Sequence, residues 1–245
     1  MNKKISIILS TFNEKNSIEF TINEIFKNIP NVEIIVVDDN SPDGTFELIK
    51  NIRNDNLKVF NRKKNKGLAT AFLTGLINSS GDVVGWLDSN MGSLSSKFPE
   101  MISNLENFDI VLLSRYISGG KDDRNLVRVV ASKLINNLAR FILRSKVKDL
   151  SSGIFVMNRN VLLDVVPVAT GHGEFFVEFL SHAEKKGNKI LEIPYTHPID
   201  IDGNSKSFPN ISRFLYLGFF YIIRLFQTIG MIVEMSGIVV EFTHL

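Results

Sequence analysis

Asp88 and Asn90 are the residues best placed to do chemistry, because both carry side-chain oxygens directly after an apolar run. The run, residues 83–87 (VVGWL), is typical of a buried strand. In open α/β sheets, ligands bind at the carboxyl ends of the strands. A carboxylate and a neighbouring amide oxygen on a rigid strand end can hold Mg²⁺ or Mn²⁺, and such an ion can hold a diphosphate.

Three other predicted strands also end in polar residues. Strand 4–10 is followed by Asn13 and Glu14, strand 32–37 by Asp38 and Asp39, and strand 108–113 by Arg115. Right-handed crossovers between parallel strands place such ends along one edge of the sheet. We therefore expect one edge to collect several carboxylates and an arginine.

Helical and strand-like segments alternate along the chain. Predicted helices cover residues 17–27, 45–53, 67–78, 126–143 and 174–185. Further strands are predicted at 57–60 and 189–193, and a turn followed by a strand at 149–157. This alternation indicates an α/β fold with a mostly parallel sheet flanked by helices.

The composition sets the limits of the interpretation. The 245 residues are 44% hydrophobic and 22% charged, which suits one large folded domain or a domain with an appendage. A net charge of +2 is too small to indicate nucleic acid as a partner. The absence of cysteine excludes disulfides, thiolate zinc sites and a thiol nucleophile. The short apolar start is interpreted as the first strand and not as a signal peptide.

The predicted helix 126–143 is amphipathic and basic, with Arg128, Lys133 and Arg140 among its apolar residues. The polar side is either an ordinary solvated face or a contact for anionic lipid head groups or a phosphorylated acceptor.

The segment 214–240 is apolar, with Arg224 and Glu234 as its only charges. Each of its uncharged runs is shorter than the ~18–20 residues needed to span a bilayer. A helix in the membrane interface, a single span that tolerates Arg224, and a core or dimer helix all fit this pattern. We divide the chain into a domain at 1–206 and a membrane-associating helical tail at 207–245.

Seven short stretches resemble glycosyltransferase family 2, and most closely its dolichol-phosphate (polyprenol-phosphate) mannosyltransferases. They are residues 10–14 (STFNE), 35–45 (IVVDDNSPDGT), 66–71 (KGLATA), 88–90 (DSN), 114–116 (SRY), 149–153 (DLSSG) and 203–206 (GNSK). The resemblance implies a GT-A fold and transfer of a sugar, commonly mannose from GDP-mannose, to a polyprenyl or dolichyl phosphate with inversion. It also implies a divalent cation, Mg²⁺ or Mn²⁺, and a place at the cytoplasmic face of a membrane.

The resemblance also implies roles for individual residues. Glu14 and Asp39 would hold the base and ribose of the nucleotide-sugar, since carboxylates accept from amide and hydroxyl donors, while Asp38 would orient the loop. The substrate-binding set that it implies is Ser10, Phe12, Glu14, Val37, Asp39, Asp88, Ser89, Asn90, Arg115 and Lys206.

Asp88 and Asn90 are the implied metal ligands, and with Arg115 they form the implied catalytic set. Arg115 and Lys206 would bind phosphates. The nucleophile would be the lipid phosphate itself, so the chain need not supply a strong base and has to position the reactants and stabilise the leaving diphosphate.

Five positions depart from the family pattern, of which Ser10 (usually proline) and Phe12 (usually tyrosine) are minor. Asn90 stands where a second aspartate is usual, Gly92 where the branch often has glutamine, and Asp200 where an arginine is common. Fewer charges around the cation should weaken metal binding, and a carboxylate at 200 cannot clamp a phosphate. Two other functions therefore stay open: a family 2 enzyme with a polysaccharide acceptor, and a catalytically weakened homologue that serves as a membrane-associated binding subunit.

Overall fold

The computed structural model describes residues 3–168, 173–198, 221, 223 and 225–228. Lys206, Asp200 and most of the predicted tail lie outside these residues. The predictions made for them therefore remain predictions.

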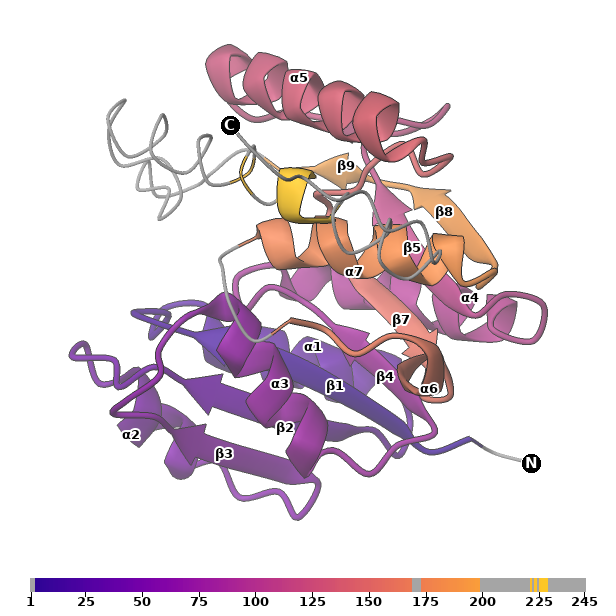
Figure 1. The fold of residues 1–245 in the computed structure, drawn as a ribbon. Helices are drawn as coiled ribbons and strands as arrows, with labels where there is room; N and C mark the ends of the chain where they lie inside the picture. Colours follow the sequence, from indigo (N-terminus) through magenta and orange to yellow (C-terminus); the bar gives the residue numbers. More distant parts are fainter. Residues whose placement is uncertain (1–2, 169–172, 199–220, 222, 224, 229–245) are drawn as a thin grey trace, which may run out of the picture.

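Seven strands of the described chain form one sheet in the order β3-β2-β1-β4-β7-β5-β8 (Figure 1). Their bounds are β1 (Ile5–Thr11), β2 (Glu33–Asp38), β3 (Leu57–Asn61), β4 (Val83–Trp86), β5 (Ile110–Ser114), β7 (Phe155–Asn158) and β8 (Ile190–Pro194). A small parallel pair joins β6 (Lys121–Asp122) to β9 (Thr196–His197).

The sheet is mostly parallel, as predicted, and β7 is its antiparallel member. β7 lies between β4 and β5 and runs opposite to both. β4 and β5 therefore run in the same direction, and β1 and β2 are parallel to β4. The carboxyl ends of these four strands meet at one edge, and the segment that enters β7 arrives at the same edge.

Helices cover both faces of the sheet. They are α1 (Ile18–Asn28), α2 (Thr45–Lys50), α3 (Leu68–Asn78), α4 (Phe98–Asn104), α5 (Leu126–Leu143), α6 (Val161–Asp164) and α7 (Glu174–Lys185), with a 3₁₀ helix, η1 (Gly92–Lys97). The helices at 126–143 and 174–185 have the predicted bounds. The segment η1–α4 was not among the predicted helices.

Two apolar cores result, because successive side chains of a strand point to opposite faces. Ile8 belongs to the core under α3 and α7, where the ring centroids of Phe72 and Trp86 are 5.1 Å apart. Ile7 belongs to the core under α1 and α4, together with Phe98. Strands buried on both faces read as continuous apolar runs, which explains why the sequence revealed them.

Leu225, in the predicted tail, is 2% exposed and packs into the core on the α7 side. Residues 225–228 are helical (Figure 1). Within the described part of the chain, no helix combines the length and apolarity needed to cross a bilayer.

Candidate functional site

The loops after β1 and β2 are held together by Asp38, which is fully buried. Its Oδ1 accepts from Thr11 Oγ1 at 2.8 Å. Ser41 donates to both carboxylate oxygens, from its backbone N at 2.8 Å and from its hydroxyl at 2.5 Å. Asp38 thus stabilises the loop through internal hydrogen bonds. Its neighbour Asp39 is the carboxylate that could contact a ligand at the sheet edge.

Asp39 joins the ends of β2 and β3 to the start of α3. Its Oδ1 accepts from Nε of Arg62 at 2.9 Å and from Nη2 of the same guanidinium, and its Oδ2 accepts from Gly67 N at 2.7 Å. A carboxylate has about four acceptor sites. Three are filled here, so Asp39 keeps capacity for about one further donor from a ligand.

Glu14 and Phe12 lie in the turn between β1 and α1. The backbone N of Glu14 donates to Thr45 Oγ1 at 3.0 Å, and its Oε2 accepts from Ser17 Oγ at 2.8 Å. Phe12 is 44% exposed, with the ammonium of Lys66 5.9 Å from its ring centroid. Ser10 is half-buried on β1, and Val37 is fully buried inside β2.

Asp88, Ser89 and Asn90 form the turn that follows β4. Asp88 is half-buried and Asn90 is exposed. Between them, Ser89 is buried and its carbonyl accepts from Thr21 Oγ1 of α1 at 2.8 Å. The backbone of the turn is therefore anchored, while the oxygens at 88 and 90 are presented at the sheet edge.

The absence of a side chain at position 92 has a steric reason. A Cβ added to Gly92 would lie 2.7 Å from Thr21 Cα and 2.8 Å from Thr21 Oγ1. The backbone of η1 therefore packs directly on α1. A glutamine at this position would require α1 and η1 to separate.

One carboxylate oxygen and one amide oxygen fit a cation that keeps water and phosphate among its ligands, as Mg²⁺ does. Among the described residues there is no group of three or more His, Cys, Asp or Glu side chains that could hold a metal. Asp88 and Asn90 alone could hold only a cation that takes its other ligands from water or from a phosphate.

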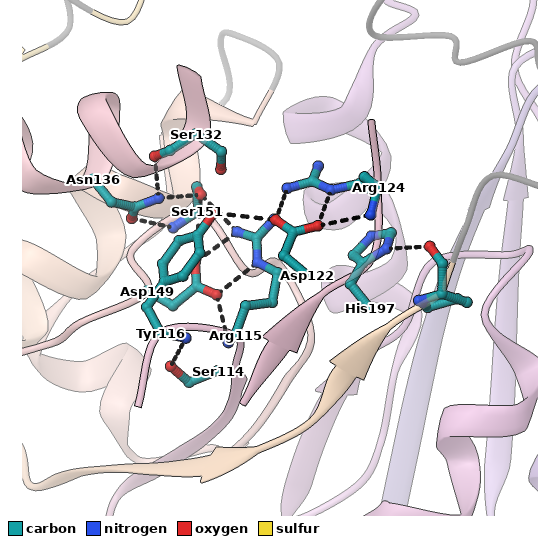
Figure 2. A network of polar contacts seen from close by, with 11 residues as sticks. Ser114, Arg115, Tyr116, Asp122, Arg124, Ser132, Asn136, Asp149, Ser151 and His197 are labelled. Carbon is teal, nitrogen blue, oxygen red and sulfur yellow. Dashed lines mark hydrogen bonds and ion pairs between the residues drawn. The ribbon is translucent and has the colours of Figure 1, made fainter. Parts of the chain in front are cut away.

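Arg115, directly after β5, is bound by Asp149, which lies before β7 (Figure 2). Its Nε and Nη2 donate to the two carboxylate oxygens at 2.7 and 2.6 Å, and its backbone N donates to Oδ2 at 2.9 Å. The side chains are 3% and 0% exposed. Burial by itself would lower the pKa of Arg115, but the charge and hydrogen bonds of Asp149 raise it, so the guanidinium stays charged.

A second pair, Asp122 and Arg124, adjoins the first (Figure 2). Arg124 donates from Nε and Nη2 to Asp122 at 2.7 and 2.6 Å, and Nη1 of Arg115 lies 3.7 Å from Asp122. Burial raises the pKa of Asp122, but the hydrogen bond and charge of Arg124, with the charge of Arg115, lower it to about 2. Two arginines and two aspartates thus balance each other beside the sheet edge.

Two side chains of the β8–β9 segment, Tyr195 and His197, feel the charges of this network. Burial, with smaller contributions from the charges of Arg124 and Arg115, lowers the pKa of His197 to about 4. Burial raises the pKa of Tyr195, and the charges of Asp149 and Asp88 also raise it. Tyr195 is thus within electrostatic reach of both the Arg115 network and the β4 turn.

The structure brings the polar strand ends to one edge, as predicted. Sequence reasoning gave no role to Arg62, Asp122 or Tyr195. Arg62 had a usable signal, because it comes two residues after the predicted strand 57–60 and so was expected at the same edge. Asp122 and Tyr195 lie in short segments whose sequence carries no comparable pattern.

The chain matches the family described as Glycosyl transferase family 2 over residues 6–166. It is 33% identical over 215 residues to a dolichol-phosphate mannosyltransferase of Pyrococcus furiosus, an alignment that covers 83% of this chain and 59% of that protein. The chain thus spans about three fifths of that relative. It is 30% identical over 205 residues to a polyprenol monophosphomannose synthase of Mycolicibacterium smegmatis, covering 78% of this chain and 76% of the relative.

Solved structures with the same fold include glucosyl-3-phosphoglycerate synthase from Mycobacterium tuberculosis. The complex with Mn²⁺, UDP and glucosyl-3-phosphoglycerate has a TM-score of 0.71 and 21% identity, covering 94% of this chain and 81% of that chain. The complex with Mg²⁺ and UDP has a TM-score of 0.68 and 22% identity, covering 94% and 80%. The predicted GT-A fold is confirmed.

Proposed function

Because the chain belongs to glycosyl transferase family 2, we propose that it transfers a hexose from a nucleotide-sugar to the phosphate of a polyprenyl or dolichyl lipid. The proposed donor is GDP-mannose, and the anomeric configuration is inverted. The observation that carries the proposal is the single sheet edge where Asp39, the Asp88–Asn90 turn and Arg115 meet. The names of two relatives that are 30–33% identical support this acceptor class.

The donor nucleoside would bind over the ends of β1 and β2. Asp39 keeps capacity for about one hydrogen bond, which suits a ribose hydroxyl or a base N–H. Glu14 is fixed by backbone and side-chain contacts next to the exposed ring of Phe12. This pre-organised turn would orient the nucleoside without a large rearrangement.

Asp88 and Asn90 would hold a divalent cation on the donor diphosphate, where it would offset the charge of the leaving group. The backbone of their turn is anchored to α1 through Ser89 and Thr21. The backbone that carries the two side chains is thus fixed at the strand end, which helps to position a diphosphate.

Arg115 would present a guanidinium of fixed orientation beside the reacting phosphates, with its charge balanced by Asp149. Two of its three guanidinium nitrogens donate to Asp149, so its orientation is set before substrate binds. A phosphate monoester is already a competent nucleophile, so the chain has to hold it in line with the anomeric carbon. Lys206 is the second proposed phosphate ligand. The proposed location is the cytoplasmic face of a membrane.

One observation favours a second candidate function, that of a catalytically weakened binding subunit. Gly92 packs so tightly on Thr21 that a larger residue does not fit at this position. Position 90 carries an amide in place of a carboxylate. Fewer ligands around the cation would weaken donor binding. This candidate predicts nucleotide-sugar binding with little or no transfer.

The test is a transfer assay with the full chain. Labelled nucleotide-sugars, including GDP-mannose, UDP-glucose and UDP-galactose, are incubated with Mn²⁺ or Mg²⁺, with and without polyprenyl phosphate. We expect label in the organic phase only when acceptor is present, with GDP-mannose as donor. Transfer to a polysaccharide without lipid would favour a different acceptor. Donor binding with no transfer to either acceptor would favour the binding subunit.

A further inference from the structure

The connector at residues 144–149 leads from the end of α5 toward β7, and its last residue is Asp149, the partner of Arg115. The connector belongs to no helix or strand, so its backbone N–H groups have no partner within a regular element. Asp149 is fully buried, and a buried N–H needs an acceptor inside the protein. Carboxylates from two other elements supply the acceptors for this connector.

Glu192 of β8 binds two successive N–H groups of the connector. Its Oε2 accepts from Lys148 N at 2.8 Å, and its Oε1 accepts from Asp149 N at 2.9 Å. Hydrogen bonds to a charged acceptor are stronger than those between neutral groups. Because the two carboxylate oxygens hold adjacent residues, Glu192 fixes both the position and the direction of the backbone that carries the Asp149 side chain.

Glu192 and Arg115 lie on neighbouring strands of the sheet. β8 pairs in parallel with β5, where Leu112 stands opposite Glu192, and Arg115 directly follows β5 (Figure 1). The backbone N of Arg115 donates to Asp149 Oδ2 at 2.9 Å. Asp149 is thus held to the end of β5 by its side chain and to β8 by its backbone. Both contacts refer to one pair of hydrogen-bonded strands.

The contact with β8 is needed because the carboxylate of Asp149 is bound mainly by Arg115 itself. Its short hydrogen bonds, at 2.6–2.9 Å, all come from that residue, while the hydroxyl of Ser151 is 3.4 Å from Oδ1. A pair that is bound mainly to itself could turn as a unit about the end of the strand. Nε and Nη2 of Arg115 follow the Asp149 carboxylate, so the direction of the guanidinium depends on where the Asp149 backbone is held.

From this geometry we propose that Glu192 is a positioning residue for the transfer reaction. By accepting from the backbone N–H groups of Lys148 and Asp149, it sets the place of the Asp149 carboxylate and, through it, the orientation of the Arg115 guanidinium. The proposal rests on the proposed function in one respect, namely the role of Arg115 beside the reacting phosphates. A misplacement of about 1 Å in a group that positions substrate can cost roughly a hundred-fold in rate.

A second carboxylate on the same connector provides a matched control. Glu184 of α7 accepts from Lys146 N at 2.8 Å and from the hydroxyl of Ser145 at 2.5 Å. Glu184 and Glu192 are both half-buried. Glu184 therefore stabilises the connector by the same chemistry, but at residues that precede the Asp149–Arg115 pair. Its removal should loosen the connector without directly releasing Asp149.

The test compares Glu192→Ala with Glu184→Ala in the full chain. The first readout is the exchange with solvent of the Arg115 Nε–H, observed in a proton–nitrogen NMR spectrum and assigned by its loss in Arg115→Lys. This readout needs no nucleotide-sugar and no polyprenyl phosphate, so it is independent of the proposed function. The second readout is kcat/KM for transfer from GDP-mannose to polyprenyl phosphate.

We expect Glu192→Ala to speed exchange of the Arg115 Nε–H by about ten-fold or more, and to lower kcat/KM by about ten-fold or more. Glu184→Ala should change each by about two-fold or less. Urea unfolding should show similar losses of stability in the two variants, since each leaves backbone donors without their acceptor. A loss of stability alone would therefore speed exchange equally in both.

A conservative pair of variants accompanies the alanine pair. Glu192→Gln keeps one acceptor oxygen, so its exchange rate and kcat/KM should lie between those of Glu192→Ala and the native chain. Circular dichroism verifies that each variant is folded. If Glu192→Ala does not fold, Glu192→Gln is compared with Glu184→Gln by the same two readouts.

Two results would overturn the proposal. Equal exchange of the Arg115 Nε–H in the variants of Glu192 and Glu184 would show that both carboxylates only stabilise the connector. Faster exchange in Glu192→Ala with unchanged kcat/KM would show that the contact does not serve the reaction. If the native chain transfers no sugar, the proposed function fails, and the exchange rates alone support or overturn the hold of Glu192 on Arg115.

Discussion

Arg115 and Asp149 form a bidentate ion pair at the sheet edge, with Nε and Nη2 2.7 and 2.6 Å from the two carboxylate oxygens. The residues are 34 positions apart in sequence, yet both reach this edge because β7 enters the sheet antiparallel to β5. The same aspartate also accepts from the backbone N of Arg115. The pair therefore fixes both the charge and the backbone where we propose that phosphates bind.

Asp149→Asn should destabilise the fold by about 3–5 kcal/mol, because it leaves the buried guanidinium of Arg115 without its main counter-charge. Urea unfolding at neutral pH measures this. The matched control is Asp123→Asn, which breaks an exposed pair with Lys121 and should cost about 1 kcal/mol or less. Equal losses in both variants would show that the buried pair has no special structural role.

Asn90→Asp should strengthen the metal dependence of donor binding. A second carboxylate beside Asp88 adds a negative charge next to the proposed cation, so half-maximal donor binding should need roughly five-fold less Mn²⁺. Titration calorimetry with nucleoside diphosphate and increasing Mn²⁺ measures it. Ser93→Asp, an exposed change three residues away, serves as the control. An unchanged Mn²⁺ requirement in Asn90→Asp would place the cation elsewhere.

Gly92→Ala should cost about 1–3 kcal/mol, because its Cβ would lie 2.7 Å from Thr21 Cα. The neighbouring Ser93→Ala, at an exposed position, should leave stability within about 0.5 kcal/mol. Thermal unfolding measures the stability of both variants relative to the parent. If Gly92→Ala is as stable as the parent, α1 and η1 do not pack as closely as described.

His197 should make the fold less stable in mild acid. Its pKa is about 4 in the folded chain, below the ordinary 6.5, mainly because burial disfavours the imidazolium. As the pH falls from 6.5 to 4, the unfolded chain takes up a proton that the folded chain does not. Stability therefore drops across this window, by at most about 3 kcal/mol.

His197→Gln should flatten this part of the pH profile. The free energy of unfolding of both proteins is measured by urea titration at pH 7 and pH 5. The difference between the two pH values should be smaller in the variant. Parallel profiles would mean that His197 titrates normally. Asp122 contributes to the pH dependence of stability only at lower pH. Its stabilising charge is lost as the pH falls from 3.8 through its folded-state pKa of about 2.

Much of the fold follows from local pattern. Strands such as β2 read as unbroken apolar runs because both faces are buried, and the bounds of α5 and α7 follow from apolar spacing. The direction of β7 could not be predicted, because an apolar segment indicates a strand but not its orientation. The 3₁₀ helix η1 was missed because residues 92–97 have little apolar periodicity. The helix α4 was missed although Phe98, Met101 and Leu105 stand at helical spacing, so its sequence carried a signal that was not used.

For the candidate site too, the local sequence predicted some residues and could not predict others. Asp88 and Arg115 were placed correctly at the edge because Arg115 directly follows β5 and Asp88 comes two residues after the end of β4. Their partners were harder to find. Nothing in the spacing of Asp39 and Arg62 predicts that they pair, because the contact depends on where β3 ends relative to β2. Contacts between strand ends that are distant in sequence need the sheet order, which local pattern does not supply.

The most direct test of the central claim is lipid-phase transfer by the full chain, compared with Asp88→Asn. Labelled GDP-mannose, Mn²⁺ and polyprenyl phosphate are incubated with each protein, and label is counted in the organic phase. We predict acceptor-dependent label with the native chain and a roughly hundred-fold or greater loss with Asp88→Asn, since that variant removes the carboxylate proposed to hold the cation. Equal transfer by both proteins would contradict the proposed site, and no transfer by the native chain with any nucleotide-sugar would contradict the proposed activity.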